Sequence, residues 1–157
     1  MKAVYAGSFD PITLGHVDII GRLLNFTSEL YVLVTEASNK SYLFTRDERM
    51  QLVRSVLKRH SQVKVEGFDG LTVEFARRVG APVIIRGIRA VADYDQEMAM
   101  ASVNRVLAAE IETLTVFASP KYNFISSRLV KEVAQHGGEL SSLVPQEAAE
   151  ALRKKFR

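Results

Sequence analysis

The sequence predicts an α/β fold in which helices cover both faces of a parallel sheet. Two observations predict this fold. Apolar, β-rich runs alternate with segments of helical periodicity from one end of the chain to the other. The runs are also continuously rich in Val and Ile, as is typical of strands buried on both faces. We therefore expect a single doubly wound domain over residues 1–157, built around five parallel strands.

Five apolar runs predict the strands of the sheet. They are Lys2–Ala6, Leu30–Thr35, Val63–Glu66, Val83–Ile85 and Thr113–Ala118. Segments with apolar residues at helical spacing lie between them. The first two carry the stripes Val17, Ile20, Leu23, Leu24 and Met50, Val53, Val56, Leu57.

The helix that carries the second stripe has a recognisable start. Thr45, with Glu48 three residues later, has the sequence pattern of a capping box. Further helices are expected at Leu71–Val79, Asp93–Ala108 and Ser126–His136, the last of them ended by Gly137 and Gly138. Pro145 is suited to the first turn of a final helix that reaches Phe156. This order of elements predicts a Rossmann-like, doubly wound domain with a five-stranded parallel sheet.

Composition narrows the class of protein. The chain has 157 residues, of which 47% are hydrophobic and 25% charged, which is ordinary for a globular protein. It has no cysteine, so disulfides and thiolate metal sites are excluded. A net charge of +3 suits either nucleic acid or a small polyanionic substrate. With neither a signal-like start nor a membrane-length apolar stretch, we expect a cytoplasmic protein without a membrane partner.

Polar and basic residues follow the predicted strands. "GSFDPITLGH" comes after the first strand, and "EASNKSYLF", which contains Lys40, comes after the second. Arg86 and Arg89 leave the fourth strand in "RGIRA", and "SPKYNFISSR" follows the fifth. Ligands of doubly wound sheets bind beyond the carboxyl ends of the strands. These cations, His16 and several hydroxyl groups therefore predict a polyphosphate site.

The first of these stretches is suited to binding an anion. We expect Gly7 to let the chain leave the strand sharply, and Asp10–Pro11 to form a turn before the helix that begins near Thr13. The free N–H groups of that helix start attract phosphate, and His16 lies in its first turn. Neither G-x-G-x-x-G nor the phosphate loop G-x-x-x-x-G-K-[ST] occurs in the chain.

"GSFDPITLGH" resembles the first signature of the nucleotidyltransferases that carry a (T/H)-x-G-H motif. Together with "RGIRAVADYDQE" and "FISSRLVKEVAQHGG", it has the order and spacing found in the bacterial phosphopantetheine adenylyltransferases, and the chain length agrees with a single nucleotidyltransferase domain over 1–157. The sequence departs from the family pattern at Ala6, where proline is common, at "YDQE", and at Arg128, where a small hydroxyl residue is usual.

The resemblance implies adenylyl transfer from ATP to 4′-phosphopantetheine, which gives dephospho-coenzyme A and pyrophosphate in coenzyme A biosynthesis. It further implies Mg²⁺ bound together with ATP, a homohexamer, and coenzyme A as a feedback inhibitor. The nucleophile is already a phosphate anion, so catalysis needs positioning and electrostatics rather than a strong base or a covalent intermediate. Because the chain has no convincing cluster of carboxylates, we expect the metal ion to be carried by ATP.

The resemblance also assigns residues. His16, Lys40 and Arg89 are the implied catalytic residues. The acceptor would be held by Ser8, Lys40, Arg86 and the backbone of Thr72. The implied ATP contacts are Ser8, Phe9, His16, Gly87, Ile88, Arg89, Glu97, Tyr122, Asn123, Phe124, Ile125, Ser126, Ser127 and Arg128.

Three alternatives remain open at the level of sequence. The nearest is a related nucleotidyltransferase with another acceptor or nucleotide, such as a nicotinamide-mononucleotide adenylyltransferase or a cytidylyltransferase. A non-catalytic nucleotide-binding module is the second, and a nucleic-acid-binding protein, which the basic end Arg153–Arg157 would suit, is the third. Some of these residues also have a purely structural interpretation. Ser126 and Ser127 would serve only as a helix cap, and Arg86 and Arg89 only as surface ion-pair partners.

Overall fold

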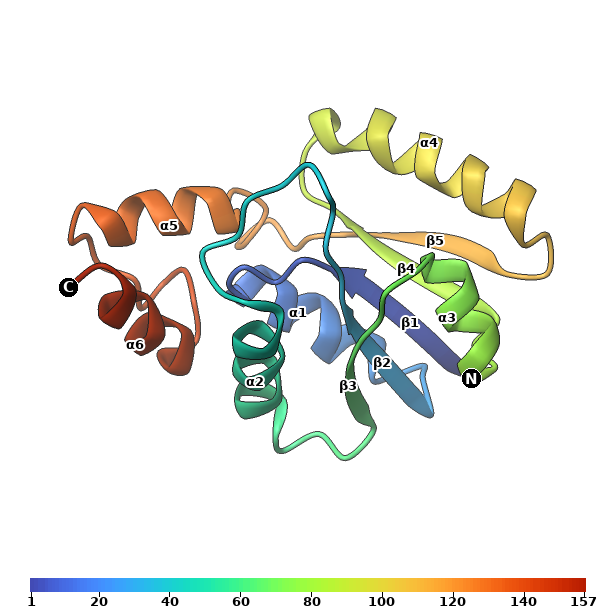
Figure 1. The fold of residues 1–157 in the computed structure, drawn as a ribbon, viewed down its shortest axis with the longest axis horizontal. Helices are drawn as coiled ribbons and strands as arrows, with labels where there is room; N and C mark the ends of the chain where they lie inside the picture. The colour runs from blue at the N-terminus through green and yellow to red at the C-terminus, as the bar shows by residue number, and fades with distance from the viewer.

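The structure, a computed structural model, describes residues 1–157 and confirms the predicted five-stranded parallel sheet. The strands lie side by side in the order β3-β2-β1-β4-β5, and every neighbouring pair is parallel (Figure 1). The elements are β1 (Lys2–Gly7), α1 (Leu14–Leu23), β2 (Glu29–Val34), α2 (Arg46–Leu57), β3 (Val63–Gly67), α3 (Thr72–Val79), β4 (Val83–Ile88), α4 (Val91–Leu107), β5 (Glu112–Phe117), α5 (Ser127–Gln135) and α6 (Gln146–Lys155).

The apolar core is divided by the sheet into two layers. The larger layer packs α1, α2, α5 and α6 against one face, with Ile20, Val53 and Leu152 among its fully buried members. The smaller layer packs α3 and the turn after α4 against the other face, around Phe75 and Ile84. Both faces of the central strands are therefore covered, as the Val- and Ile-rich runs predict. None of the six helices combines the length and the apolarity needed to cross a membrane.

Helix α2 starts where its sequence predicts. The Thr45 hydroxyl accepts from the Glu48 N–H at 3.2 Å, and the Glu48 carboxylate accepts from the Thr45 N–H at 2.8 Å, which completes the capping box. Its buried residues are Arg49, Val53 and Leu57, spaced four apart along one face. All four residues of the predicted stripe face the core, because Val53 and Leu57 are buried and Met50 and Val56 pack against them partly buried. The burial of Arg49 on the same helix was not predicted.

Two predicted boundaries near the site are wrong. Strand β4 does not end at Ile85 but continues to Ile88, because β5 keeps pairing with it through Ile88↔Phe117. Of the two arginines predicted to follow the strand, Arg86 therefore lies within it and only Arg89 follows it. Helix α4 begins at Val91 rather than Asp93, because the Asp93 carboxylate accepts from the Ala90 N–H at 3.3 Å and caps the helix from its first turn.

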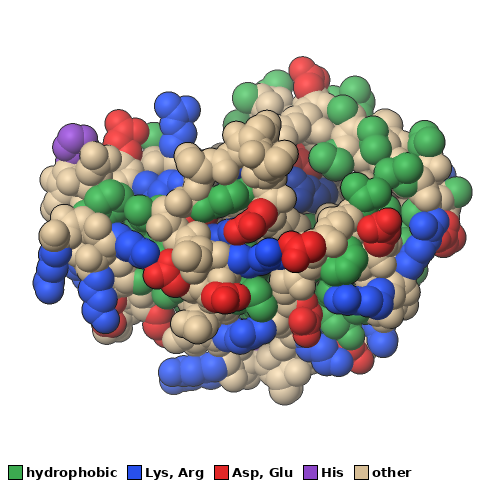
Figure 2. All heavy atoms as spheres, in the orientation of Figure 1, with side chains coloured by type: hydrophobic (Ala, Val, Ile, Leu, Met, Phe, Trp, Pro, Cys, Tyr) green, Lys and Arg blue, Asp and Glu red, His purple; other side chains and the backbone are tan.

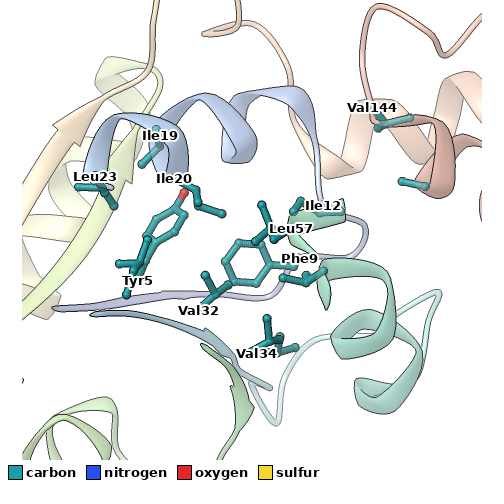
Figure 3. Close-up of a cluster of buried hydrophobic side chains, with 14 of the residues drawn as sticks. Tyr5, Phe9, Ile12, Ile19, Ile20, Leu23, Val32, Val34, Leu57 and Val144 are labelled. Carbon is teal, nitrogen blue, oxygen red and sulfur yellow. The ribbon is translucent and has the colours of Figure 1, made fainter. Parts of the chain in front are cut away.

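The sharp exit predicted at Gly7 occurs at Phe9 instead. Gly7 is still paired with Val34 in the sheet, whereas Phe9 has a φ of 48° in the left-handed region. A non-glycine residue there costs about 1–3 kcal/mol. The Phe9 ring is buried between α1 and the sheet beside Tyr5 (Figure 3), and burial of such a ring contributes about 1.5–3 kcal/mol, which offsets that cost. Gly7 serves close packing, since a Cβ there would lie 3.1 Å from the Phe9 ring.

Candidate active site

A cavity of about 290 Å³ opens at the carboxyl end of the sheet, where the sequence predicts the site. Segments distant in the sequence meet there: the end of β1, the start of α1, the loop after β2, the end of β4 and the start of α5. The predicted site residues that line it are Ser8, Phe9, His16, Lys40, Arg86, Gly87, Arg89, Ile125, Ser126, Ser127 and Arg128. The topology therefore brings most of the predicted site together.

The remaining predicted site residues do not line this cavity. Thr72 begins α3, Ile88 is buried at the end of β4, and Glu97 is buried beneath Arg86. Tyr122, Asn123 and Phe124 belong to the turn before α5, and Phe124 is exposed. Their assigned ligand contacts stay predictions.

His16 is held by the helix that carries it. Its backbone N–H donates to the Thr13 hydroxyl at 3.4 Å, and its ring Nδ1 accepts from the Thr13 N–H at 3.0 Å. This is a capping box in which histidine takes the place usually filled by Glu or Gln. Because Nδ1 is an acceptor, the neutral ring carries its proton on Nε2. The fold thus determines which nitrogen of His16 can donate to a ligand.

The cavity lining is strongly cationic. It contains Lys40, Arg86, Arg89 and Arg128, and no aspartate or glutamate. The hydroxyl groups of Ser8, Thr13, Ser126 and Ser127 also line the cavity beside these cations. Such a lining neutralises an anion with several phosphate groups and gives no carboxylate to hold a metal ion.

Arg86 is oriented before any ligand arrives. Its Nε and Nη2 donate to the Glu97 carboxylate at 2.6 and 2.8 Å, and Nη1 donates to the Ala6 carbonyl at 2.8 Å. Burial is the largest influence on the pKa of the Arg86 guanidinium and lowers it, but the hydrogen bonds to Glu97 and the charges of Glu97 and Tyr5 together raise that pKa above its usual value. Three of the five N–H groups of an arginine are then occupied, so two are left for a ligand.

The start of α5 forms part of the cavity lining. Ser126 caps the helix by accepting from the Leu129 N–H at 3.1 Å, and Ser127 donates to the Pro11 carbonyl at 2.9 Å. Arg89 reaches this helix start through its Nη1, which donates to the Ile125 carbonyl at 3.2 Å. The capping role considered for Ser126 is therefore present, and it leaves the positive end of the helix dipole facing the cavity.

Comparison with known proteins agrees with this geometry. A model of the cytidylyltransferase-like family matches residues 4–133, which is most of the chain. The chain belongs to this nucleotidyltransferase family. It is 52% identical to the phosphopantetheine adenylyltransferase of Bdellovibrio bacteriovorus, over 99% of this chain and 97% of that protein. It is 48% identical to that of Thermotoga neapolitana, over 100% and 98%, and 46% identical to that of Staphylococcus haemolyticus, over 99% and 97%. The predicted resemblance is confirmed.

His16 of this nucleotidyltransferase is neutral at physiological pH. Burial and, secondarily, the nearby charge of Arg89 lower its pKa from 6.5 to about 4. The unfolded chain therefore binds a proton in a range where the folded chain does not, and stability is lost as pH falls from 6.5 towards 4. Thermal melts over this range should show a smaller acid-induced fall in Tm for His16→Gln than for the wild type. His60→Gln is the control. If it reduced the acid-induced fall in Tm as much as His16→Gln does, the effect would not come from His16.

Sequence reasoning missed three residues that support the site. Arg49 is fully buried and donates to the carbonyls of Ser8, Thr35 and Phe44. Its position four residues before Val53 and eight before Leu57 was a usable signal of burial. Asp10 was assigned only a turn, although its buried carboxylate accepts three hydrogen bonds.

The third missed residue is Lys131 on α5, which donates to Asp10 at 2.8 Å from 121 positions away along the chain. No local pattern in the sequence indicates a contact over that separation.

Proposed function

We propose that this nucleotidyltransferase transfers the adenylyl group of ATP to 4′-phosphopantetheine and releases pyrophosphate and dephospho-coenzyme A. The observation that carries this proposal is a cavity with cations on both sides and no carboxylate. Lys40 and Arg86 would bind the acceptor phosphate, while Arg89 and the start of α5 would bind the ATP phosphates. The three full-length relatives that bear the name phosphopantetheine adenylyltransferase support the choice of acceptor.

The reaction needs no general base. A phosphate oxygen of the acceptor attacks the α-phosphorus of ATP, and the bond from that phosphorus to the bridging oxygen breaks. Its electron pair leaves with pyrophosphate. Negative charge on the α-phosphoryl oxygens is stabilised by the Nε2–H of His16, whose tautomer Thr13 holds. Positioning two polyanions in line supplies roughly 7–11 kcal/mol of the barrier.

Mg²⁺ would enter with ATP rather than reside on the protein. The cavity lining provides hydroxyls and cations but no carboxylate, and no group of three potential metal ligands occurs among His, Asp and Glu side chains. That donor set does not suit a protein-held divalent cation, which prefers carboxylate oxygens. The residues derived above act on the phosphate groups directly.

The test is pyrophosphate release from Mg-ATP with a panel of acceptors. The panel contains 4′-phosphopantetheine, unphosphorylated pantetheine, nicotinamide mononucleotide and glycerol 3-phosphate, and CTP replaces ATP in a parallel series. Pyrophosphate release only with ATP and 4′-phosphopantetheine supports the proposal. Absence of release with unphosphorylated pantetheine identifies the phosphate of the acceptor as the nucleophile. Release with a different pair would replace the substrate assignment. Binding of ATP without release would favour a non-catalytic module.

Coenzyme A would inhibit by occupying the acceptor side of the cavity. Coenzyme A contains the 4′-phosphopantetheine group of the acceptor, so its phosphate would meet the same cations. In the pyrophosphate assay it should raise the KM for 4′-phosphopantetheine and leave the extrapolated kcat unchanged. Inhibition that excess acceptor does not relieve would contradict a shared site.

We also propose that the chain assembles as a homohexamer through α4 and β5. The two buried residues of α4, Glu97 and Asn104, are both polar, whereas much of its apolar surface is exposed. Val91 is 90% exposed, Val106 85%, and Phe117 at the end of the edge strand β5 70%. Figure 2 shows hydrophobic side chains gathered over α4. A patch of this kind supports contact with further copies of the chain.

A charged substitution in this patch should break the assembly. We expect wild-type protein to sediment as a six-chain species and Val103→Glu/Val106→Glu to sediment as smaller species with an unchanged circular dichroism spectrum, because buried carboxylates would be unpaired. Phe26→Glu is the matched control, since Phe26 is 65% exposed and lies after α1, outside the patch. A wild-type monomer, or a double variant that keeps the wild-type mass, would overturn this proposal.

A further inference from the structure

Asp10 lies at the junction of the two halves of the site without lining the cavity. It follows Phe9 in the loop between β1 and α1, and only 3% of its surface is exposed. A carboxylate removed from water to this extent is unfavourable unless donors surround it. The identity of those donors therefore indicates what Asp10 does.

The donors come from both sides of the cavity. Oδ1 accepts from the Phe44 N–H at 3.0 Å, and Oδ2 accepts from the Leu43 N–H at 3.0 Å. Oδ2 also accepts from Nζ of Lys131 at 2.8 Å. One carboxylate thus joins the loop between β2 and α2 to helix α5, and charge makes each of these hydrogen bonds stronger than a neutral one.

Each joined segment carries part of the predicted machinery. Leu43 lies three residues after Lys40, in a loop without helix or strand, so the contact with Asp10 limits where Lys40 can be. Lys131 lies one turn after Ser127 and near Arg128 on α5. Asp10 therefore ties the loop that holds Lys40 to the helix whose start faces the ATP side.

Arg49, a buried residue of α2, holds the same loop by separate hydrogen bonds. Its guanidinium donates to the Phe44 and Thr35 carbonyls at 3.2 and 3.0 Å, so both ends of the loop are anchored to the same buried charge. Arg49 thus holds the loop to α2, and Asp10 connects it to α5.

We propose that Asp10, through its ion pair with Lys131, is a positioning residue that sets the distance between the acceptor cation Lys40 and the ATP-binding start of α5. This inference rests on the proposed function and deepens it. Without the ion pair, the acceptor and ATP each still bind to their own residues, but they are no longer aligned with each other. Loss of alignment lowers kcat far more than it raises either KM, since a misplacement of about 1 Å costs about 100-fold in rate.

The test cuts the link on the Lys131 side. Lys131→Met removes the cation but keeps the length of the side chain, and Lys131→Arg restores the charge. We expect kcat to fall about 10- to 100-fold in Lys131→Met, with both KM values nearly unchanged, and to recover in Lys131→Arg. Lys64→Met is the matched control. Lys64 also donates to a carboxylate at 2.8 Å, that of Glu29, but it lies at the start of β3, at the end of the strand away from the cavity.

Hydrogen exchange gives a second readout that does not depend on turnover. Peptides that cover residues 36–44 and 126–131 should both exchange faster in Lys131→Met than in the wild type or in Lys64→Met. Four results would each overturn the inference. Two concern Lys131→Met: an unchanged kcat, or unchanged exchange in residues 36–44. The others are an equal loss of kcat in Lys64→Met and no recovery of kcat in Lys131→Arg. If wild-type protein released no pyrophosphate with any acceptor, the proposed function would fail while the exchange data still decided whether the link exists.

Discussion

Replacement of His16 by alanine should lower kcat by about 10²- to 10³-fold while the KM values for ATP and the acceptor change little. His16 lines the cavity, and the Thr13 cap occupies Nδ1 and leaves the Nε2–H for a ligand. We expect this group to interact most strongly with charge that develops only in the transition state. An interaction of this kind affects kcat rather than ground-state binding. Steady-state kinetics in both substrates, with Tm as a check on folding, measures the effect.

A second His16 variant separates catalysis from capping. His16→Gln keeps an acceptor at the third helix position for the Thr13 N–H, so the capping box survives while the imidazole is lost. We expect Tm to recover in His16→Gln but kcat to remain low. His60→Ala, in the turn after α2, is the control and should leave kcat unchanged. Near-wild-type kcat in His16→Ala would exclude the role assigned to this histidine.

Replacement of Lys40 by alanine should raise the KM for 4′-phosphopantetheine by about 10- to 100-fold, equivalent to the 1.5–3 kcal/mol of a hydrogen bond to a charged group. Lys40 lines the cavity from an exposed loop, and its ammonium group has no ion pair within the protein. Its removal therefore leaves no buried group unpaired, and we expect Tm and the KM for ATP to stay at their wild-type values.

Two comparisons make the Lys40 result specific. Lys58→Ala removes an exposed lysine just after α2, away from the cavity, and should change neither KM. Arg86→Ala, in contrast, should lower Tm as well as acceptor affinity, because it strands the buried carboxylate of Glu97. If Lys40→Ala raised the KM for ATP alone, Lys40 would belong to the other half of the site.

Local patterns were sufficient for most of the sheet and for the start of α2. Continuous Val- and Ile-rich runs identify strands that are buried on both faces, and Thr45 with Glu48 identifies a cap, because both depend on residues close in sequence. The end of β4 was not predictable in this way. "RGI" has no apolar pattern of its own, and it is extended because β5 pairs with it.

The cations of the site were predictable for a related reason. In a parallel sheet all strands end at the same edge, so Lys40, Arg86 and Arg89 must come near one another once the strands are identified. The pairing of Arg86 with Glu97 was not predictable, because it depends on how α4 packs on β4. The same holds for Asp10, whose three donors come from two other segments.

Residue types and their spacing along the chain were thus enough to predict the fold class and the edge of the sheet where the cationic cavity opens. These follow from strand burial and helix capping, which act over a few residues. Tertiary structure alone decided the protonated nitrogen and lowered pKa of His16, the orientation of Arg86, and the buried links through Asp10 and Arg49. The physical reason is that desolvation and charge pairing depend on which distant segments exclude water from a group, and sequence spacing does not specify that exclusion.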